Sequence, residues 1–146
     1  MKPFIGIKKI WYGDVITSAV TKTSLKTWLG TATEVENSHQ NTWLYTEDDP
    51  TYTDYINELN GDIYYRDVTQ KGAKTITFTM GVFSFDDKVD LQGGEKVDTD
   101  AGWAASDTPG IVNKAIVGQT KTGNYIVFTN AAVIAKGNAV EKNIGL

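Results

Sequence analysis

The stretch "KTITFTMGVFSFDDKVDLQGG", from Lys74 to Gly94, changes its hydrophobic period halfway along, and this change points to the fold class. Apolar residues alternate in its first half and fall on one face of an extended chain: Ile76, Phe78, Met80 and Val82. A period of two predicts a β-strand over residues 74–83 with one buried face. The stretch therefore begins as sheet.

The second half of this stretch has the signals of a short helix. Ser84 is a good N-cap, and Asp87 three residues later completes a capping box. Gly93 stands where a helix ends in the left-handed conformation. We therefore expect a helix over Asp86–Gln92, directly after the strand and stopping abruptly at the glycine pair.

The rest of the chain reads mostly as strands joined by polar turns. We expect strands over Phe4–Trp11, with a possible extension over Asp14–Val20, and over Asn41–Thr46, Ile111–Gly118 and Tyr125–Lys136, a helix capped by Ser24 and stopped by Gly30, and a loop over Glu95–Gly110. The strand at Tyr125 is apolar on both faces, which predicts a central or doubly covered position. The last ten residues, "GNAVEKNIGL", read as an unfinished element.

The segment Pro50–Asp67 fits two structures. Tyr52, Tyr55, Ile56 and Leu59 follow helical spacing, and Pro50 suits a first helical turn. Against this, Asn60-Gly61 between two Tyr- and Ile-bearing runs is a strong signal for a two-residue hairpin turn. Thr and Tyr favour strands, so we favour the hairpin and keep the helix as the alternative.

Length and composition restrict the class of protein. A chain of 146 residues fits a single domain spanning 1–146. It has no cysteine, so disulfides and thiolate metal sites are excluded. A formal charge of −4 is a poor match for gripping phosphate backbones. No apolar run has the length of a signal peptide or a spanning helix, so we expect synthesis in the cytoplasm and no membrane contact.

Residues for catalysis or metal binding are sparse. His39 is the single histidine, which leaves no histidine-based triad or zinc cluster. The acidic runs Glu47–Asp49 and Asp98–Gly102 lack the further oxygen ligands that calcium needs, and turn formation explains their Asp residues. We expect no catalytic residue, no metal and no cofactor.

The segment Thr75–Gly94 resembles the strand-then-helix unit of bacteriophage major tail proteins, the subunits of the tail tube. The resemblance extends to Glu47–Asp67, which is similar to the long hairpin of that family, and to Gly123–Gly137, which is similar to its late core strand. Type VI secretion tube proteins are related to it in fold. The resemblance implies a β-sandwich or barrel with one or two short helices.

The same resemblance implies a function and its residues. Copies of the chain form hexameric rings, and the rings stack into a tube in the virion tail. Its partners are then the chain itself and other phage tail proteins, with DNA passing non-specifically. The resemblance makes a hairpin the candidate contact between subunits: Tyr55, Ile56, Leu59, Asn60, Gly61, Ile63, Tyr64 and Tyr65. Three residues are expected on a bracing helix outside the sheet: Phe85, Val89 and Leu91.

The aromatic content leaves a second function open. The chain has four tryptophans and seven tyrosines, which ordinary cores and subunit interfaces use. Exposed Trp and Tyr on a β-sandwich also stack on sugar rings. A carbohydrate-binding module is therefore the alternative to a structural subunit.

Overall fold

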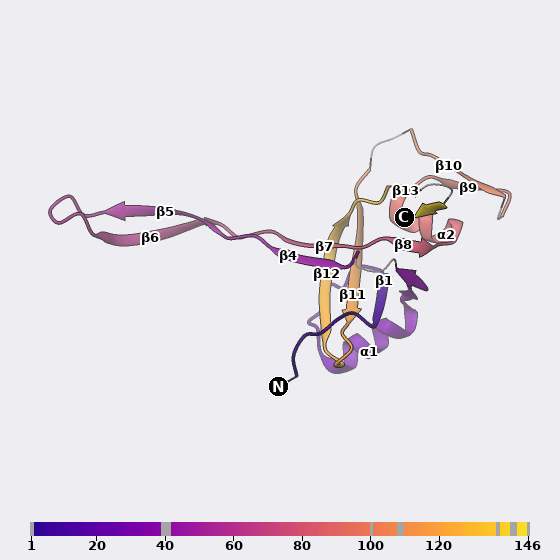
Figure 1. The fold of residues 1–146 in the computed structure, drawn as a ribbon, viewed down its shortest axis with the longest axis horizontal. Coiled ribbons are helices and arrows are strands. Elements are labelled where there is room, and N and C mark those ends of the chain that lie inside the picture. The colour runs from indigo at the N-terminus through magenta and orange to yellow at the C-terminus, as the bar shows by residue number, and fades with distance from the viewer. Residues whose placement is uncertain are drawn as a thin grey trace. The chain divides into compact units, whose positions relative to one another are not determined.

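The computed structural model shows a mainly β chain with two short helices, as the sequence predicts (Figure 1). The described residues are 2–38, 42–99, 101–107, 110–136, 138–140 and 143–145. Contacts divide the chain into two compact units: the sheet unit, residues 1–39 and 79–146, and the hairpin unit, residues 40–78. The chain has a length typical of one domain, but its residues form two compact units that are built differently.

The sheet unit is built on a four-stranded antiparallel sheet with the strand order β12-β11-β1-β2. The strands are β1 (Lys9–Gly13), β2 (Thr33–Glu34), β11 (Val112–Gln119) and β12 (Tyr125–Val133). In the register, Trp11 lies opposite Val117, and Ile116 lies opposite Phe128. Each pair shares one face of the sheet, because directly opposite residues of an antiparallel ladder point the same way.

The core of the sheet unit lies where β1 and β11 pair. The buried hydrophobic residues are Ile10, Trp11, Tyr12, Met80, Leu91, Ala115, Ile116 and Val117. Consecutive residues of one strand point to opposite faces, so burial of successive residues means that both faces are covered at this point.

The two helices cover opposite faces of this core. A Cβ atom added at Gly13 would lie 3.1 Å from the Trp28 ring, so that face looks toward α1 (Lys22–Thr31). The preceding residue, Tyr12, points the other way and hydrogen-bonds Asp87 of α2 (Phe85–Gln92). The sheet therefore lies between α1 and α2.

The strand β12 lies at the edge of the sheet, so the prediction of a central position is wrong. The central strand is β11, in which residues 115–118 are all buried. Along β12 the side chains are half-buried or exposed. The sequence of β12 is apolar on both faces, as noted above. Among the described residues, however, β12 pairs only with β11, which places it at the edge of the sheet.

The first strand is shorter and later than expected. β1 begins at Lys9, and residues 14–20 form no strand. Gly6 adopts a φ of +61°, which bends the chain out of an extended conformation. The segment before β1 is held instead by the end of β11 and by the turn after it: the Lys8 N–H donates to the Gln119 carbonyl at 2.7 Å, and the Lys121 N–H donates to the Ile5 carbonyl at 3.1 Å.

Helix α1 starts earlier and ends later than its predicted limits of Ser24 and Gly30. Its N-cap is Thr21, whose hydroxyl accepts the Ser24 N–H at 3.1 Å, while the Ser24 hydroxyl accepts the Thr21 N–H at 2.8 Å. Ser24 is therefore the third residue of the helix and not its cap. Gly30 lies inside the last turn, and the C-cap is Ala32.

The stretch Lys74–Gly94 forms two strands and a helix instead of one strand and a helix. β7 (Lys74–Thr77) pairs with β4 (Leu44–Glu47) in the hairpin unit. β8 (Met80–Val82) pairs with β3 (Asn37–Ser38) in the sheet unit. The predicted single strand is wrong because its two halves join different ladders, and the border between the units falls between them.

The predicted capping of α2 is confirmed. Ser84 and Asp87 form the capping box in both directions, and Gly93 is the C-cap. Gly93 has φ 91° and ψ −166°, which is extended at positive φ instead of left-handed helical. Only glycine adopts this region readily. The prediction that α2 ends abruptly at Gly93 is therefore correct, but the left-handed helical conformation predicted for Gly93 is wrong.

The predicted loop over 95–110 contains a small hairpin. β9 (Glu95–Val97) pairs with β10 (Gly102–Ala104). The turn between them uses positive φ angles at Asp98 and Thr99, which short polar side chains tolerate. At the other end of the chain, β13 (Asn138–Val140) pairs with β14 (Asn143–Gly145), where the sequence predicted an unfinished element.

The hairpin unit is a long antiparallel ribbon, and the helical alternative for residues 50–60 is wrong (Figure 1). β4 and β7 pair at one end, and β5 (Thr51–Ile56) pairs with β6 (Ile63–Gln70) at the other. The connection is a six-residue loop and not a two-residue turn, because the Asn57 N–H closes it on the Asp62 carbonyl at 2.7 Å. Gly61 has a φ of +76°, as a turn position requires.

Candidate assembly surfaces

The hairpin unit carries large apolar side chains that nothing in the chain covers. Nine of the sixteen exposed large hydrophobic residues in the described part of the chain belong to it: Leu44, Tyr52, Tyr55, Ile56, Leu59, Ile63, Tyr64, Tyr65 and Val68. Every residue of β6 is exposed. Leu59, in the connecting loop, is 95% exposed. Monomeric proteins rarely leave so dense an apolar surface in water.

These side chains lie on both faces of the ribbon. Tyr55 is opposite Tyr65, with ring centroids 5.9 Å apart. Tyr52 is opposite Val68, three residues along β5 and therefore on the other face. A strand pair that presents apolar groups on two faces has no internal core, and an isolated two-stranded hairpin is marginally stable in water. Its stability depends on what covers it.

One ion pair stiffens the middle of the ribbon. Arg66 is opposite Asp54, and its Nε donates to Oδ1 at 2.6 Å and its Nη2 to Oδ2 at 3.1 Å. The guanidinium also lies 4.3 Å from the Tyr52 ring centroid. The hydrogen bond and charge of Asp54 raise the pKa of Arg66. This two-point contact fixes the cross-strand register independently of the apolar pairs.

The connecting loop is ordered by its own side chains. The Asn57 Oδ1 accepts the Leu59 N–H at 2.9 Å, and the Asn60 Oδ1 accepts the Asp62 N–H at 3.0 Å. Asn side chains imitate a backbone turn in this way. The loop therefore holds Leu59 out in a fixed conformation between the acidic residues Glu58 and Asp62.

All eight predicted contact residues fall on this hairpin or its loop, and all eight are exposed. Sequence reasoning missed Tyr52 and Val68, which form an exposed pair on the face opposite Tyr55. Period-two alternation across both strands was the signal that would have found them. Leu44, in β4, extends the exposed surface toward the other end of the ribbon.

The outer edge of β12 is a second candidate surface. Among the described residues, β11 is the strand that pairs with the nine-residue β12, and the Ile16 N–H also donates to the Thr129 carbonyl of β12 at 2.9 Å. Ile134, just after the strand, is 94% exposed. A sheet edge with no second strand on it in the described part of the chain is a template for pairing with another chain.

The three residues predicted for the bracing helix lie on α2, and contacts that the sequence did not indicate hold this helix in place. Leu91 is buried, and Phe85 and Val89 are half-buried. Two longer contacts fix the ends of α2: Tyr12 hydrogen-bonds Asp87, and the Trp103 Nε1 donates to the Gly93 carbonyl at 2.8 Å. Burial and the Asp87 carboxylate raise the pKa of the Tyr12 phenol.

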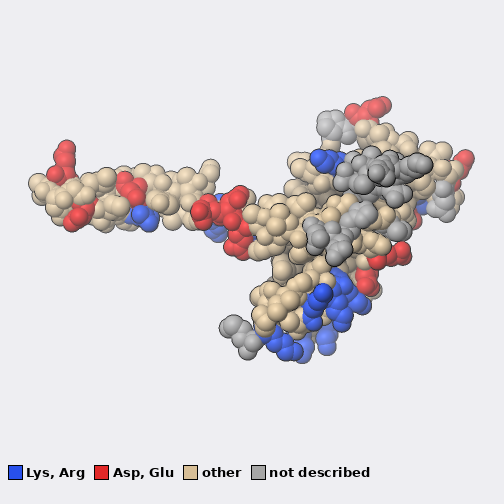
Figure 2. All heavy atoms as spheres, in the orientation of Figure 1, with Lys and Arg blue, Asp and Glu red and all other residues tan. Residues whose placement is uncertain are grey.

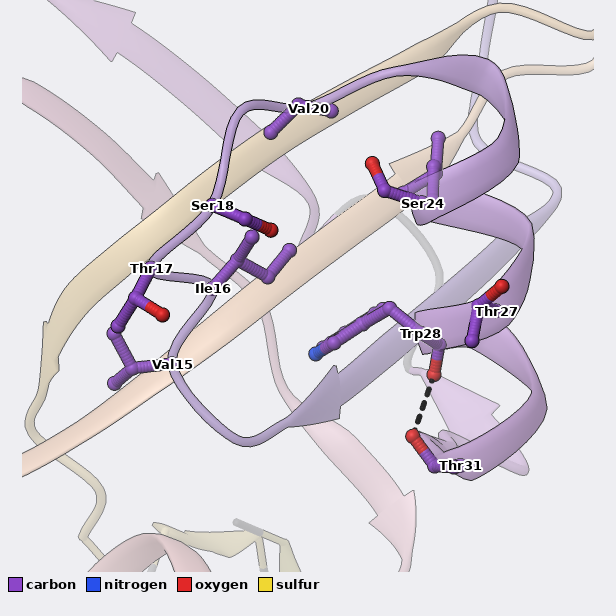
Figure 3. A pocket seen from close by; sticks show the side chains of 10 residues that line it. Val15, Ile16, Thr17, Ser18, Val20, Ser24, Thr27, Trp28 and Thr31 are labelled. Atoms are coloured by element: carbon purple, nitrogen blue, oxygen red, sulfur yellow. Dashed lines mark hydrogen bonds between the residues drawn. The ribbon is translucent and has the colours of Figure 1, made fainter.

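A hollow between α1 and the preceding loop has no reactive group (Figure 3). It measures about 400 Å³ and is lined by Val15, Ile16, Thr17, Ser18, Val20, Ser24, Leu25, Thr27, Trp28 and Thr31. Its polar atoms belong to hydroxyls, the backbone and the Trp28 indole, whose Nε1 already donates to the Asp14 carbonyl at 2.9 Å. Such a lining does not supply a titratable acid or base.

The remaining candidates for chemistry form no centre in the described residues. No group of three or more His, Asp or Glu side chains there is placed to hold a metal ion. His39 lies outside the described residues, as does Asp100 of the Asp98–Gly102 run. Neither helix in the described part of the chain has the length and apolar character needed to span a membrane.

Comparisons with protein-family models, with curated proteins and with solved structures found no match to this chain.

Proposed function

We propose that this chain is a structural subunit of a phage or prophage-derived tail tube, which assembles with copies of itself into stacked rings around a DNA-conducting lumen. The observation that carries the proposal is the hairpin unit, with its apolar side chains exposed on both faces. Burial of such groups contributes about 25 cal/mol per Å² of apolar surface. A neighbouring copy that covers the ribbon supplies that burial.

A stacked-ring tube needs two different contacts between copies. One must close into a ring, and the other must repeat along the axis without closing. The hairpin and the β12 edge are two separate surfaces available for these contacts. β12 suits strand addition, in which main-chain hydrogen bonds give affinity, and the hairpin suits side-chain burial.

This function assigns the chain to the virion tail, with other tail proteins at the ends of the tube. It is not an enzyme on this proposal, and DNA passes along it without specific recognition. The formal charge of −4 is consistent with passage, since like charges repel a phosphate backbone.

The carbohydrate-binding alternative has less support from the exposed side chains. None of the four tryptophans is exposed: Trp11 is buried, and Trp28, Trp43 and Trp103 are half-buried. The exposed aromatic residues of the hairpin are tyrosines divided between the two faces of a ribbon.

The test is the mass and shape of the purified protein, by light scattering and negative-stain microscopy. We expect rings or tubes for the wild-type chain. Replacing Leu59 and Tyr64 by Ser removes exposed apolar groups and should weaken association by roughly tenfold or more. Ile111→Ser removes an equally exposed apolar group of the sheet unit and serves as the control. A wild-type protein that stays monomeric at high concentration in every salt condition contradicts the proposal.

A further inference from the structure

The net charge of the molecule resides in the hairpin unit. Residues 40–78 hold seven Asp and Glu against three Lys and Arg, which gives −4. The sheet unit holds eleven of each sign and is formally neutral. Figure 2 shows acidic side chains outnumbering basic ones along the hairpin unit. The two units therefore differ in charge as well as in architecture.

The acidic charge of the hairpin is largely unpaired. Asp54 is neutralised by Arg66, and this is the one ion pair within the described residues of the hairpin unit. Glu58 and Asp62 flank Leu59 in the loop, and Asp67 lies on β6. We call Glu58, Leu59 and Asp62 the hairpin tip. It combines two negative charges with one fully exposed apolar side chain.

The sheet unit has a surface of the opposite character at its N-terminal segment. Figure 2 shows basic side chains gathered over the end of the unit where Figure 1 draws this segment and α1. We call Lys2, Lys8 and Lys121 the lysine cluster. All three are exposed, and none takes part in an ion pair in the described residues.

Hydrogen bonds to backbone carbonyls hold the N-terminal segment, with Lys2 and Lys8, against the turn that carries Lys121. The Asn124 Nδ2 donates to the Lys2 carbonyl at 3.1 Å, and the Lys121 N–H donates to the Ile5 carbonyl at 3.1 Å. The Lys121 side chain crosses Gly6, since a Cβ there would lie 3.0 Å from its Cδ. The cluster is therefore built by the fold, because the turn after β11 clamps residues 2–8.

Two exposed apolar residues lie within this same clamped segment. Phe4 is 67% exposed and Ile5 is 55% exposed. The segment thus exposes both lysines and apolar side chains, and the hairpin tip exposes both carboxylates and an apolar side chain. The two surfaces are complementary in charge and alike in apolar character.

We propose that the hairpin tip of one copy docks on the N-terminal segment of a second copy, with Glu58 and Asp62 against Lys8 and Lys121 and with Leu59 against Phe4. This inference rests on the proposed self-assembly and names its contact. The hairpin tip and the N-terminal segment are different surfaces of one chain, so the contact between copies is head-to-tail. Such a contact repeats without limit unless the rotation between successive copies closes them into a ring.

The acidic tip of another copy fits the lysine cluster better than nucleic acid does. Binding to a phosphate backbone draws on many clustered cations and shows a steep salt dependence. Here only three lysines belong to the clamped segment and the turn that holds it, in a chain with a formal charge of −4, and the same segment exposes two apolar side chains. Exposed apolar groups beside the charges favour a protein partner that buries them.

The test uses two charge-reversed variants of the full-length chain. Lys8→Glu with Lys121→Glu reverses the receptor, and Glu58→Lys with Asp62→Lys reverses the tip. All four positions are exposed, so the fold is retained, which circular dichroism checks. We expect each variant alone to associate about tenfold more weakly than the wild type at low salt, by sedimentation velocity. Mixing the two variants should restore association, because each then offers the complement of the other.

A control variant and a DNA-binding assay distinguish the possible outcomes. Lys136→Glu with Asp107→Lys reverses exposed charges elsewhere and should associate like the wild type. If the wild type assembles and both reversed variants match it, this contact is wrong while self-assembly stands. If the wild type does not assemble, both proposals fall. Binding of the wild type to a short DNA duplex, lost in the receptor variant without any change in self-association, assigns the cluster to nucleic acid and overturns the contact.

Discussion

Tyr12 of the central sheet donates a hydrogen bond to Oδ1 of Asp87, and the other oxygen of that carboxylate caps α2 by accepting the Ser84 N–H at 3.0 Å. One side chain thus starts the helix and anchors it to the core. Tyr12 is 2% exposed, so its hydroxyl has no water to replace this acceptor.

Removing that hydroxyl should loosen α2. Tyr12→Phe keeps the ring and deletes the donor to a charged acceptor, for which we expect a loss of about 1.5–3 kcal/mol in the free energy of unfolding. Urea denaturation measures it. Tyr125→Phe, at an exposed tyrosine, is the matched control and should change stability little. Equal stability of the Tyr12 variant and the wild type would show that the contact is energetically neutral.

The same hydroxyl predicts a dependence of stability on pH. Burial, and next the hydrogen bond to Asp87, raise the pKa of Tyr12 above its unfolded value of 10.0. The folded state therefore holds the phenolic proton more tightly, and its stabilising contribution is complete below pH 10 and falls as the pH rises above it. The free energy of unfolding, measured between pH 8 and 11, should decline more steeply in the wild type than in Tyr12→Phe. Parallel curves would contradict the raised pKa.

The glycine pair after α2 offers a graded test of backbone strain. Gly93 and Gly94 have φ angles of +91° and +86°. A Cβ at Gly93 meets nothing within 4 Å, whereas one at Gly94 would collide with the Ala104 carbonyl and lie 2.8 Å from the Trp103 Nε1. We expect Gly93→Ala to cost about 1–3 kcal/mol from conformation alone, and Gly94→Ala to cost more. Thermal or urea unfolding ranks the two, and equal costs would contradict the close approach.

Gly72, in the hairpin unit, is a third position where a side chain would meet the backbone. A Cβ at Gly72 would collide with the Asp48 carbonyl, next to the point where the Asp48 N–H donates to the Ala73 carbonyl at 2.8 Å. Gly72→Ala should therefore disrupt the ribbon and abolish the proposed self-association, while hydrogen exchange in β11 stays slow. Gly30→Ala, at an exposed position of α1 where an added Cβ meets nothing within 4 Å, is the control and should leave the ribbon and the proposed association unchanged. Slow exchange throughout β5 and β6 in the Gly72 variant would contradict this reading.

Local features were the ones that the sequence could predict. The capping box of Ser84 and Asp87 depends on residues three apart, and the hairpin and the β11–β12 pair depend on alternation and turn residues. These signals act over a few residues, so tertiary context seldom overrides them. The mainly β class with short helices follows from them.

Features set by long-range pairing were not predictable in the same way. Tyr12 and Asp87 are 75 residues apart, and no pattern marks them as partners. The strand at 74–83 alternates without interruption, although its two halves join different ladders. The edge position of β12 and the clamping of residues 2–8 likewise depend on which strand pairs with which, and alternation does not encode this choice.

Ser38 lies opposite Met80 in the β3–β8 pair, so residues 40–78 leave the sheet unit and return to it at neighbouring points. The ribbon is thus an insertion in the topological sense, and a short glycine-rich linker between those two positions would reconnect the chain without rerouting any strand. Such a miniature would show whether the sheet unit folds without the ribbon, and whether the proposed self-association requires it.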